Sequence, residues 1–270
     1  MNYFETPLTS AHEKSGIFEK PFEIIPDYRY LYLPTNRIIA LDKIMELMES
    51  RAKNIVITGE SGSGKTTLAR RIEFKLNLCH NHYPLFIDVN NNLHSVEFWK
   101  MLVKHFNLRI SEKPEKNQKT ILDFLEQNSG IVNLDLIIDN TELTNYDLET
   151  TLIELDDFRY NGIRLFHEIL FMTIQEDPTK SNNSYPKFRL ERFDFSETRK
   201  MIEYRLFISG SPQLFSEKAI ERIFEFTQGN PREVVNLCRE SLDYLSRNGY
   251  TFIDEIDIEK IKLFMNFSST

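Results

Sequence analysis

The chain has 270 residues, of which 41% are hydrophobic and 27% are charged, and its net charge is −8. This length fits one large domain or one domain with a small companion, and the composition excludes a disordered or fibrous protein. The acidic balance argues against a protein that coats nucleic acid through bulk positive charge, although a local basic face stays compatible with it. Only 9 glycines are present, so the cluster Gly59, Gly62 and Gly64 predicts a sharp turn or a close approach to a ligand.

Cysteine usage and hydropathy indicate the compartment. The two cysteines, Cys79 and Cys238, lie far apart and lack metal-ligand spacing, which suits ordinary thiols in a reducing compartment. No apolar run approaches the ~18 residues of a membrane helix, and the acidic start MNYFETPLTS lacks a signal-peptide core. We therefore expect a cytoplasmic protein without a membrane segment.

An aromatic arm punctuated by prolines opens the chain. Pro21, Pro26 and Pro34 discourage a continuous helix in residues 1–36. We expect this arm to lie extended across the next domain. From Arg37 onward, apolar residues at helical spacing predict a helix before the first strand.

Strands and helices then alternate along the chain. Short apolar runs predict strands at 54–58, 84–89, 134–139, 168–174 and 187–195, and apolar periodicity predicts helices at 95–108, 120–128 and 146–160, besides one after the glycine loop. This alternation predicts a parallel five-stranded sheet flanked by helices. Later helices are predicted at 196–208, 216–227 and 231–247, with one more near the end. The predicted domains are an extended arm (1–36), an α/β domain (37–195) and an all-helical domain (196–270).

The sequence GESGSGKT at 59–66 fits the phosphate-loop pattern G-x-x-x-x-G-K-[ST], with a predicted strand before it and a helix after it. Glycines let successive backbone N–H groups point at phosphate oxygens, and the helix N-terminus adds partial positive charge there. Lys65 would reach the terminal phosphates of ATP, and the Thr66 hydroxyl would bind Mg²⁺. The predicted nucleotide ligands in this loop are Gly59, Glu60, Ser61, Gly62, Ser63, Gly64, Lys65, Thr66 and Thr67.

A second Mg²⁺ ligand should end a neighbouring apolar strand, and LDLIID supplies Asp139. A glutamate that polarises the attacking water often follows such an aspartate. Here Asn140 follows instead, and an amide cannot accept the proton. Glu142 could substitute if the loop turns back, although its spacing differs from that of a direct replacement and an ordinary solvated loop acid is the preferred alternative. We therefore predict tight nucleotide binding with slow hydrolysis, with Lys65, Asp139, Asn140 and Glu142 as candidate catalytic residues.

Two later segments carry further candidates. The strand in EILFMTIQED should present a polar residue near the γ-phosphate, either Thr173 or the preferred Gln175, and an ordinary strand-end residue is the alternative. In TQGNPREVVNLC, Gly229 and Asn230 predict a turn that places Arg232 in the first turn of a helix. An arginine so placed can swing over the phosphates and report the nucleotide state to the helical domain.

These landmarks together resemble the AAA+ superfamily, and within it the ExeA/GspA secretion ATPases and the MshM pilus ATPases, which are related to TniB/TnsC transposition regulators and origin-recognition ATPases. KPFEIIPDYRYLYLP (20–34) is similar to the N-terminal signature of the ExeA type, and YRLFISG and TQGNPREVVNLC are similar to its helical lid. The resemblance covers about residues 17–250. It implies ATP and Mg²⁺ as cofactors, a P-loop AAA+ sheet followed by a small helical lid domain, and self-association into a ring or filament.

The resemblance also implies residue roles: Lys65 and Thr66 as Walker A residues, Asp139 as the Walker B acid, Gln175 or Thr173 as sensor 1, and Arg232 as sensor 2. Tyr28, Tyr30 and Arg37 would border the adenine, although packing under the sheet explains the tyrosines equally well. Asn140 departs from the family pattern. The polar loop DPTKSNNSYP departs too, and leaves the arginine finger with only weak candidates in Lys180, Arg189 and Arg192.

Several functions stay open. The first is a slow ATPase that acts as a nucleotide-dependent assembly switch for a separate protein partner of the secretion or pilus type. We expect a bare AAA+ module, without the membrane segment or winged helix that relatives carry. Alternatives are an ATP-dependent DNA-binding regulator of transposition or replication, a non-hydrolysing nucleotide-binding scaffold, and a small-molecule kinase, which fits poorly. The candidate DNA contacts are Lys100, Lys104 and Arg109 or Lys113, Lys116 and Lys119, which solvated helix surface explains as well.

Overall fold

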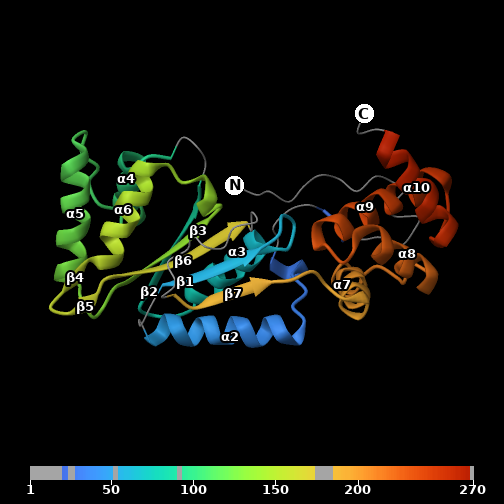
Figure 1. Ribbon diagram of the computed structural model, residues 1–270, viewed down its shortest axis with the longest axis horizontal. Helices are drawn as coiled ribbons and strands as arrows, with labels where there is room; N and C mark the ends of the chain where they lie inside the picture. Colours follow the sequence, from blue (N-terminus) through green and yellow to red (C-terminus); the bar gives the residue numbers. More distant parts are fainter. Residues whose placement is uncertain (1–19, 24–27, 51–53, 90–92, 174–184, 268–270) are drawn as a thin grey trace. The chain divides into compact units, whose positions relative to one another are not determined.

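The structure is a computed structural model that describes residues 20–23, 28–50, 54–89, 93–173 and 185–267. The chain divides into two compact units (Figure 1). An α/β unit comprises Thr35–Ser61 and Lys65–Leu190. A helical unit comprises the chain from Glu191 onward, the arm up to Pro34, and the loop residues Gly62–Gly64.

A five-stranded parallel sheet forms the centre of the α/β unit, as the sequence predicts. The strands are β1 (Ile55–Gly59), β2 (His82–Asp88), β3 (Asn133–Asp139), β6 (Phe166–Thr173) and β7 (Lys187–Leu190), in the order β2-β3-β6-β1-β7. The helices are α2 (Thr35–Ser50), α3 (Lys65–Leu76), α4 (Ser95–His105), α5 (Pro114–Gln127) and α6 (Tyr146–Asp157), with a short 3₁₀ helix η2 (Thr141–Leu143). The carboxyl ends of the parallel strands therefore meet at one edge of the sheet.

Strand β3 is buried along its whole length, because helices cover both faces of the sheet. Leu134, Leu136 and Ile138 belong to a core cluster built with residues of α4, α5 and α6, three helices that Figure 1 shows grouped together. Asp139 takes the opposite alternation and meets Thr66 at the start of α3. Successive side chains of a strand point to opposite faces of the sheet, so Asp139 lies on the other face from these three core residues.

Some element bounds differ from the predicted ones. Helix α5 begins at Pro114 rather than near residue 120, with proline at the first helical position, where its missing N–H costs nothing. The end of the predicted helix 146–160 is instead the hairpin β4 (Arg159–Tyr160) and β5 (Ile163–Arg164), joined by Asn161 and Gly162 at positive φ. Strand β7 stops at Leu190, because Asp194 forms a capping box with Glu197 that starts the next helix.

The helical unit packs α7 (Phe195–Ile208), α8 (Glu217–Thr227), α9 (Pro231–Asn248) and α10 (Glu255–Phe267) around an apolar core. Its buried residues come mostly from α7, α8 and α9, whose apolar side chains recur at helical spacing. None of the helices in the described part of the chain combines the length and the apolar composition needed to cross a bilayer.

The described residues of the arm belong to the helical unit, which corrects the expectation that the arm lies across the α/β domain. Phe22 is fully buried in the helical core, with its ring edge-to-face against Phe215 at 6.1 Å. The guanidinium of Arg205 donates to the carbonyl of Pro21 (2.7 Å). Burial of an aromatic ring is worth more than extended backbone contacts alone can supply, so the ring anchors the arm to the helices.

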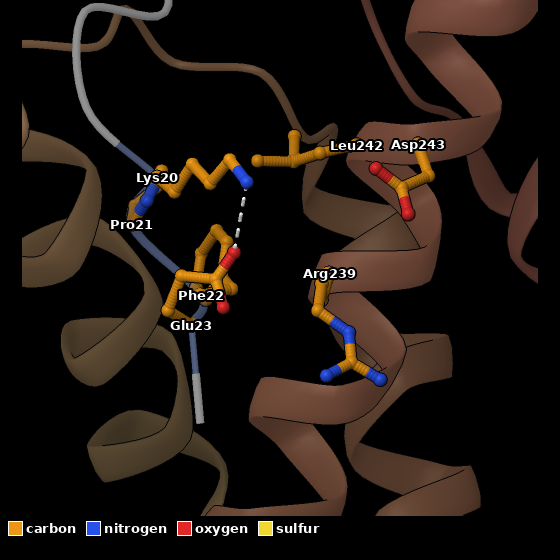
Figure 2. A pocket seen from close by; sticks show the side chains of 7 residues that line it. All are labelled: Lys20, Pro21, Phe22, Glu23, Arg239, Leu242 and Asp243. Atoms are coloured by element: carbon orange, nitrogen blue, oxygen red, sulfur yellow. Dashed lines mark ion pairs between the residues drawn. The ribbon is translucent and has the colours of Figure 1, made fainter. Parts of the chain in front are cut away.

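A small pocket lies between the arm and α9 (Figure 2). Figure 2 shows Lys20 and Glu23, which form an ion pair (3.4 Å), across from Arg239 and Asp243 of α9. Its charged residues are half-buried, whereas Phe22 is fully buried. The apolar ring of Phe22 is therefore the best-buried contact of the arm at this pocket.

Candidate functional site

The phosphate loop leaves β1 at Gly59 and enters α3 at Lys65. The side chain of Lys65 is buried, with 7% of its surface exposed, and its ammonium donates to the carbonyls of Gly59 and Glu60 (3.0 Å each). A buried ammonium needs such oxygen partners, since desolvation of an unpaired charge is costly. The carbonyls of the phosphate loop therefore stabilise the buried Lys65 ammonium.

The Thr66 hydroxyl donates to Oδ2 of Asp139 at 2.6 Å, so the structure brings the two predicted metal ligands together. Thr66 is exposed, whereas Asp139 is 1% exposed. Burial raises the pKa of Asp139, while the hydrogen bonds from Thr66 and from the Asn140 backbone N–H act to lower it. The site thus pairs one buried carboxylate with one hydroxyl at the carboxyl edge of the sheet.

This pair of oxygen donors fits Mg²⁺, which is usually bound by one or two carboxylates together with phosphate oxygens and water. The described residues contain no cluster of three or more His, Cys, Asp or Glu side chains suited to a metal. An all-protein metal cage is therefore not the arrangement here, and a bound cation would share Thr66 and Asp139 with a ligand of its own. Mg²⁺ would supply charge neutralisation to phosphate oxygens at this position.

The middle of the phosphate loop belongs to the helical unit. Gly62 and Gly64 have φ of 81° and 96°. A Cβ at Gly62 would lie 2.5 Å from Oδ1 of Asn230 and 2.8 Å from Cβ of Arg232, so a side chain does not fit there. The backbone N–H of Arg232 donates to the Gly62 carbonyl (3.2 Å). The first turn of α9 is therefore hydrogen-bonded to the phosphate loop, and the role of Arg232 as sensor 2 stays a prediction.

The turn before α9 forms as predicted. Gly229 has φ of 71°, and a Cβ there would lie 1.8 Å from the carbonyl oxygen of Phe193, which only glycine avoids. The Gly229 carbonyl accepts from the Phe193 N–H (2.9 Å). Asn230 caps α9 through Oδ1, which accepts from the N–H groups of Arg232 (3.1 Å) and Glu233 (3.4 Å). This packing fixes where α9 begins.

Three polar side chains surround the end of β3. Asn140 has left-handed φ of 57°, and its Nδ2 donates to Oδ1 of Asp88 (2.8 Å). Glu142 turns the other way, and its Oε2 accepts from the backbone N–H of Thr173 (3.1 Å). The sequence reasoning missed Asp88, although its position as the acid ending the strand next to that of Asp139 could have revealed it.

The remaining predicted site residues fall in several places. Gln175 and Lys180 lie outside the described residues, and of Tyr28 only the backbone is described. Tyr30 is buried in the helical unit, with its ring 5.5 Å from the Arg205 guanidinium. Arg37 is buried on α2 of the α/β unit. Glu60 and Thr67 are half-buried, Ser61 is exposed, Ser63 is buried, and Arg189 and Arg192 are exposed beside β7. The adenine contacts and the arginine finger stay predictions.

A comparison with protein families matches residues 48–178 to the AAA domain family. These residues form an AAA domain. The chain is also similar to general secretion pathway protein A of Aeromonas hydrophila, at 21% identity over 241 residues. That match covers 84% of this chain and 43% of the relative, so this chain spans less than half of the relative's length.

Solved structures share the fold of this AAA protein. The ORC1 protein of Aeropyrum pernix, solved in complex with DNA, gives a TM-score of 0.69 at 14% identity and covers 96% of this chain, with 71% of its own chain matched. The RuvB Holliday junction branch migration motor of Thermotoga maritima gives a TM-score of 0.59 at 17% identity, over 89% of this chain and 74% of its own. The predicted AAA+ type is confirmed by the AAA domain match, and the solved structures show the same fold.

Proposed function

We propose that this AAA protein binds ATP with Mg²⁺, hydrolyses it slowly, and uses the nucleotide to switch its own assembly. The observation that carries the proposal is the hydrogen bond between Thr66 and Asp139 (2.6 Å), which places a hydroxyl and a buried carboxylate together at the start of α3. The buried Lys65 ammonium supplies positive charge on the same loop.

Within this proposal, each residue has a separate task. Lys65 binds the terminal phosphates, and backbone N–H groups of the glycine loop and of the α3 N-terminus bind the others. Thr66 and Asp139 hold Mg²⁺, which neutralises phosphate charge. Lys65 and Thr66 lie at the start of α3 and Asp139 at the end of β3, and the Lys65 ammonium would exchange the Gly59 and Glu60 carbonyls for phosphate oxygens.

Fluorescent ATP analogue binding tests the nucleotide part. We expect Lys65→Ala to weaken binding about 10- to 100-fold, because one charge-assisted hydrogen bond set is lost. Lys75→Ala is the matched control: Lys75 lies on the same helix and forms an ion pair with the exposed Asp42, outside the phosphate loop. Equal affinity of the wild type and Lys65→Ala would contradict the proposal.

The assembly part rests on similarity. AAA structures such as RuvB, described as a branch migration motor, share the fold, and the secretion relative suggests a protein partner. Light scattering after size exclusion, with ATP analogue, ADP or no nucleotide, tests it. We expect a larger species only with the ATP analogue, and a monomer in every condition would contradict it.

A second candidate function is ATP-dependent DNA binding. It is favoured by the similarity to the ORC1 protein that was solved with DNA and by a group of exposed basic residues near the α4–α5 connection, namely Lys104, Arg109, Lys113, Lys116 and Lys119. Exposed Glu112 and Glu115 lie among them, which reduces the local positive charge. The test is to measure the affinity for duplex DNA at several salt concentrations. An affinity that falls steeply as salt rises, and that is lower in the Lys113→Glu/Lys116→Glu double variant, would support this function.

A further inference from the structure

The segment after Asp139 sends its polar side chains in two directions. Asn140 adopts the left-handed conformation (φ 57°, ψ 41°), which asparagine tolerates better than most residues. Its Nδ2 then donates to Oδ1 of Asp88 at the end of β2 (2.8 Å). The amide at the position where a water-polarising glutamate was expected is thus held on the β2 side.

The short helix η2 docks on the strand at the other side of β3. The Thr141 hydroxyl donates to the Phe171 carbonyl (3.1 Å), and Oε2 of Glu142 accepts from the Thr173 backbone N–H (3.1 Å). Both partners belong to β6. Two hydrogen bonds therefore place the Glu142 carboxylate at the end of β6.

Strand order decides which of the two side chains lies nearer the phosphate loop. In the sheet β2-β3-β6-β1-β7, strand β6 is the direct neighbour of β1, and Thr173 is the register partner of Gly59, the first residue of the loop. Strand β2, where Asn140 is held, lies two strands farther from β1 than β6 does. Among the described residues, Glu142 Oε1 has no hydrogen-bond partner, which leaves this oxygen able to accept one.

We propose that Glu142 orients the attacking water and accepts its proton, while Asp88 holds Asn140 away from it. This inference rests on the proposed ATP hydrolysis. The water oxygen forms a bond to the γ-phosphorus, the bond from that phosphorus to the β–γ bridging oxygen breaks, and ADP leaves with the bonding electrons. The water proton passes to the Glu142 carboxylate and then to solvent, so the step is balanced.

Glu142→Gln is the decisive variant, because glutamine keeps an oxygen that can accept from the Thr173 N–H but is not a proton acceptor. We expect ATP affinity within about threefold of the wild type and turnover lowered about 100-fold or more. Glu149→Gln is the matched control: Glu149 is an exposed carboxylate on α6, seven positions along the chain and outside the site. Its turnover and affinity should equal those of the wild type.

The outcomes separate this inference from the proposed function. Turnover of Glu142→Gln within about threefold of the wild type would overturn the catalytic role of Glu142. Turnover that falls in Asp88→Asn but not in Glu142→Gln would overturn it as well. A wild type that binds ATP through Lys65 but shows no turnover would overturn the role of Glu142 and leave nucleotide binding in place. A wild type without Lys65-dependent binding would remove the proposed function as well.

Discussion

The two edges of the sheet each bury a carboxylate, but they surround it differently. At the carboxyl edge, the buried Asp139 accepts a hydrogen bond from the exposed Thr66. At the amino edge, Glu168 is buried in β6, accepts from Asn54 Nδ2 (2.9 Å) and leaves Oε1 without a hydrogen-bond partner among the described residues. Burial, together with the charge of Asp156, raises the pKa of Glu168 to about 8.

The amino edge is a closed polar cluster. Arg164 donates to Asn54 Oδ1 (2.6 Å) and forms an ion pair with Asp156 (2.9 Å). Asn54 Nδ2 also donates to Asp156 (2.8 Å), and the Tyr185 hydroxyl hydrogen-bonds to Asp156. Asn54 precedes β1, Asp156 lies in α6, Arg164 lies in β5 and Tyr185 precedes β7, so the cluster links four parts of the α/β unit.

The two ends of one sheet thus use their buried acidic groups in different ways. The amino edge satisfies its polar groups mostly among themselves, which stabilises the fold but leaves little for a ligand. At the carboxyl edge, the exposed Thr66 hydroxyl and the buried Asp139 are both groups that could bind an added cation. Ligands in open parallel sheets bind at the carboxyl ends of the strands, which agrees with this division. Four variants test this difference between the two ends of the sheet.

Arg164→Ala should have the largest effect, and on stability alone. Removing the guanidinium takes away the cation that pairs with Asp156 and the donor to Asn54 Oδ1, so we expect the α/β unit to lose about 3 kcal/mol. Urea denaturation followed by the fluorescence of Trp99, the single tryptophan and a core residue of this unit, measures the loss. Arg159→Ala, on the exposed strand of the same hairpin, should cost less than about 1 kcal/mol.

Thr66→Ala should affect binding and leave stability nearly unchanged. Loss of the hydroxyl removes one Mg²⁺ ligand, so we expect Mg²⁺-dependent ATP affinity to fall about 100-fold. Thr66→Ser keeps the hydroxyl and should bind like the wild type. Titration of a fluorescent ATP analogue with and without Mg²⁺ measures both, and equal affinity of the alanine and serine variants would refute the assignment.

Glu168→Gln should change how stability depends on pH. The pKa of Glu168 is raised in the folded state, so the folded chain binds the proton more tightly, and its unfolding free energy falls as pH rises from about 5 to 8. This one group contributes about 1.4 kcal/mol per pH unit. Glutamine does not titrate, so the variant should lose that slope and gain stability at pH 8. Glu154→Gln, exposed on α6, should keep the wild-type slope.

Asn140→Glu should have the smallest effect, with turnover raised no more than about threefold, because the new carboxylate would lie beside the negative charge of Asp88. A steady-state phosphate-release assay measures the turnover of this variant. A gain of about 30-fold or more would mean that position 140 lies nearer the water than the β2 contact implies.

Most of the fold and of the phosphate site could be predicted from the local sequence. The phosphate loop is defined by its glycine spacing, by the strand before it and by the lysine and threonine after it. These features are local, because backbone N–H groups within one short turn bind the phosphates. The five strands were predictable because each contains a short apolar run, and the central strands β1 and β3 are buried almost throughout. The hairpin after α6 escaped prediction, because its two-residue strands are too short to show a period.

The AAA+ type, the phosphate loop and the acid at the end of β3 could be predicted from the sequence, because each depends on residues that are neighbours along the chain. The tertiary structure was needed to show where Asn140 and Glu142 point, because their partners Asp88 and Thr173 lie 52 and 31 positions away. It also decided that Phe22 anchors the arm in the helical unit. Contacts between strands distant in sequence carry no local periodicity, and the left-handed backbone of Asn140 turns the chain directly after β3.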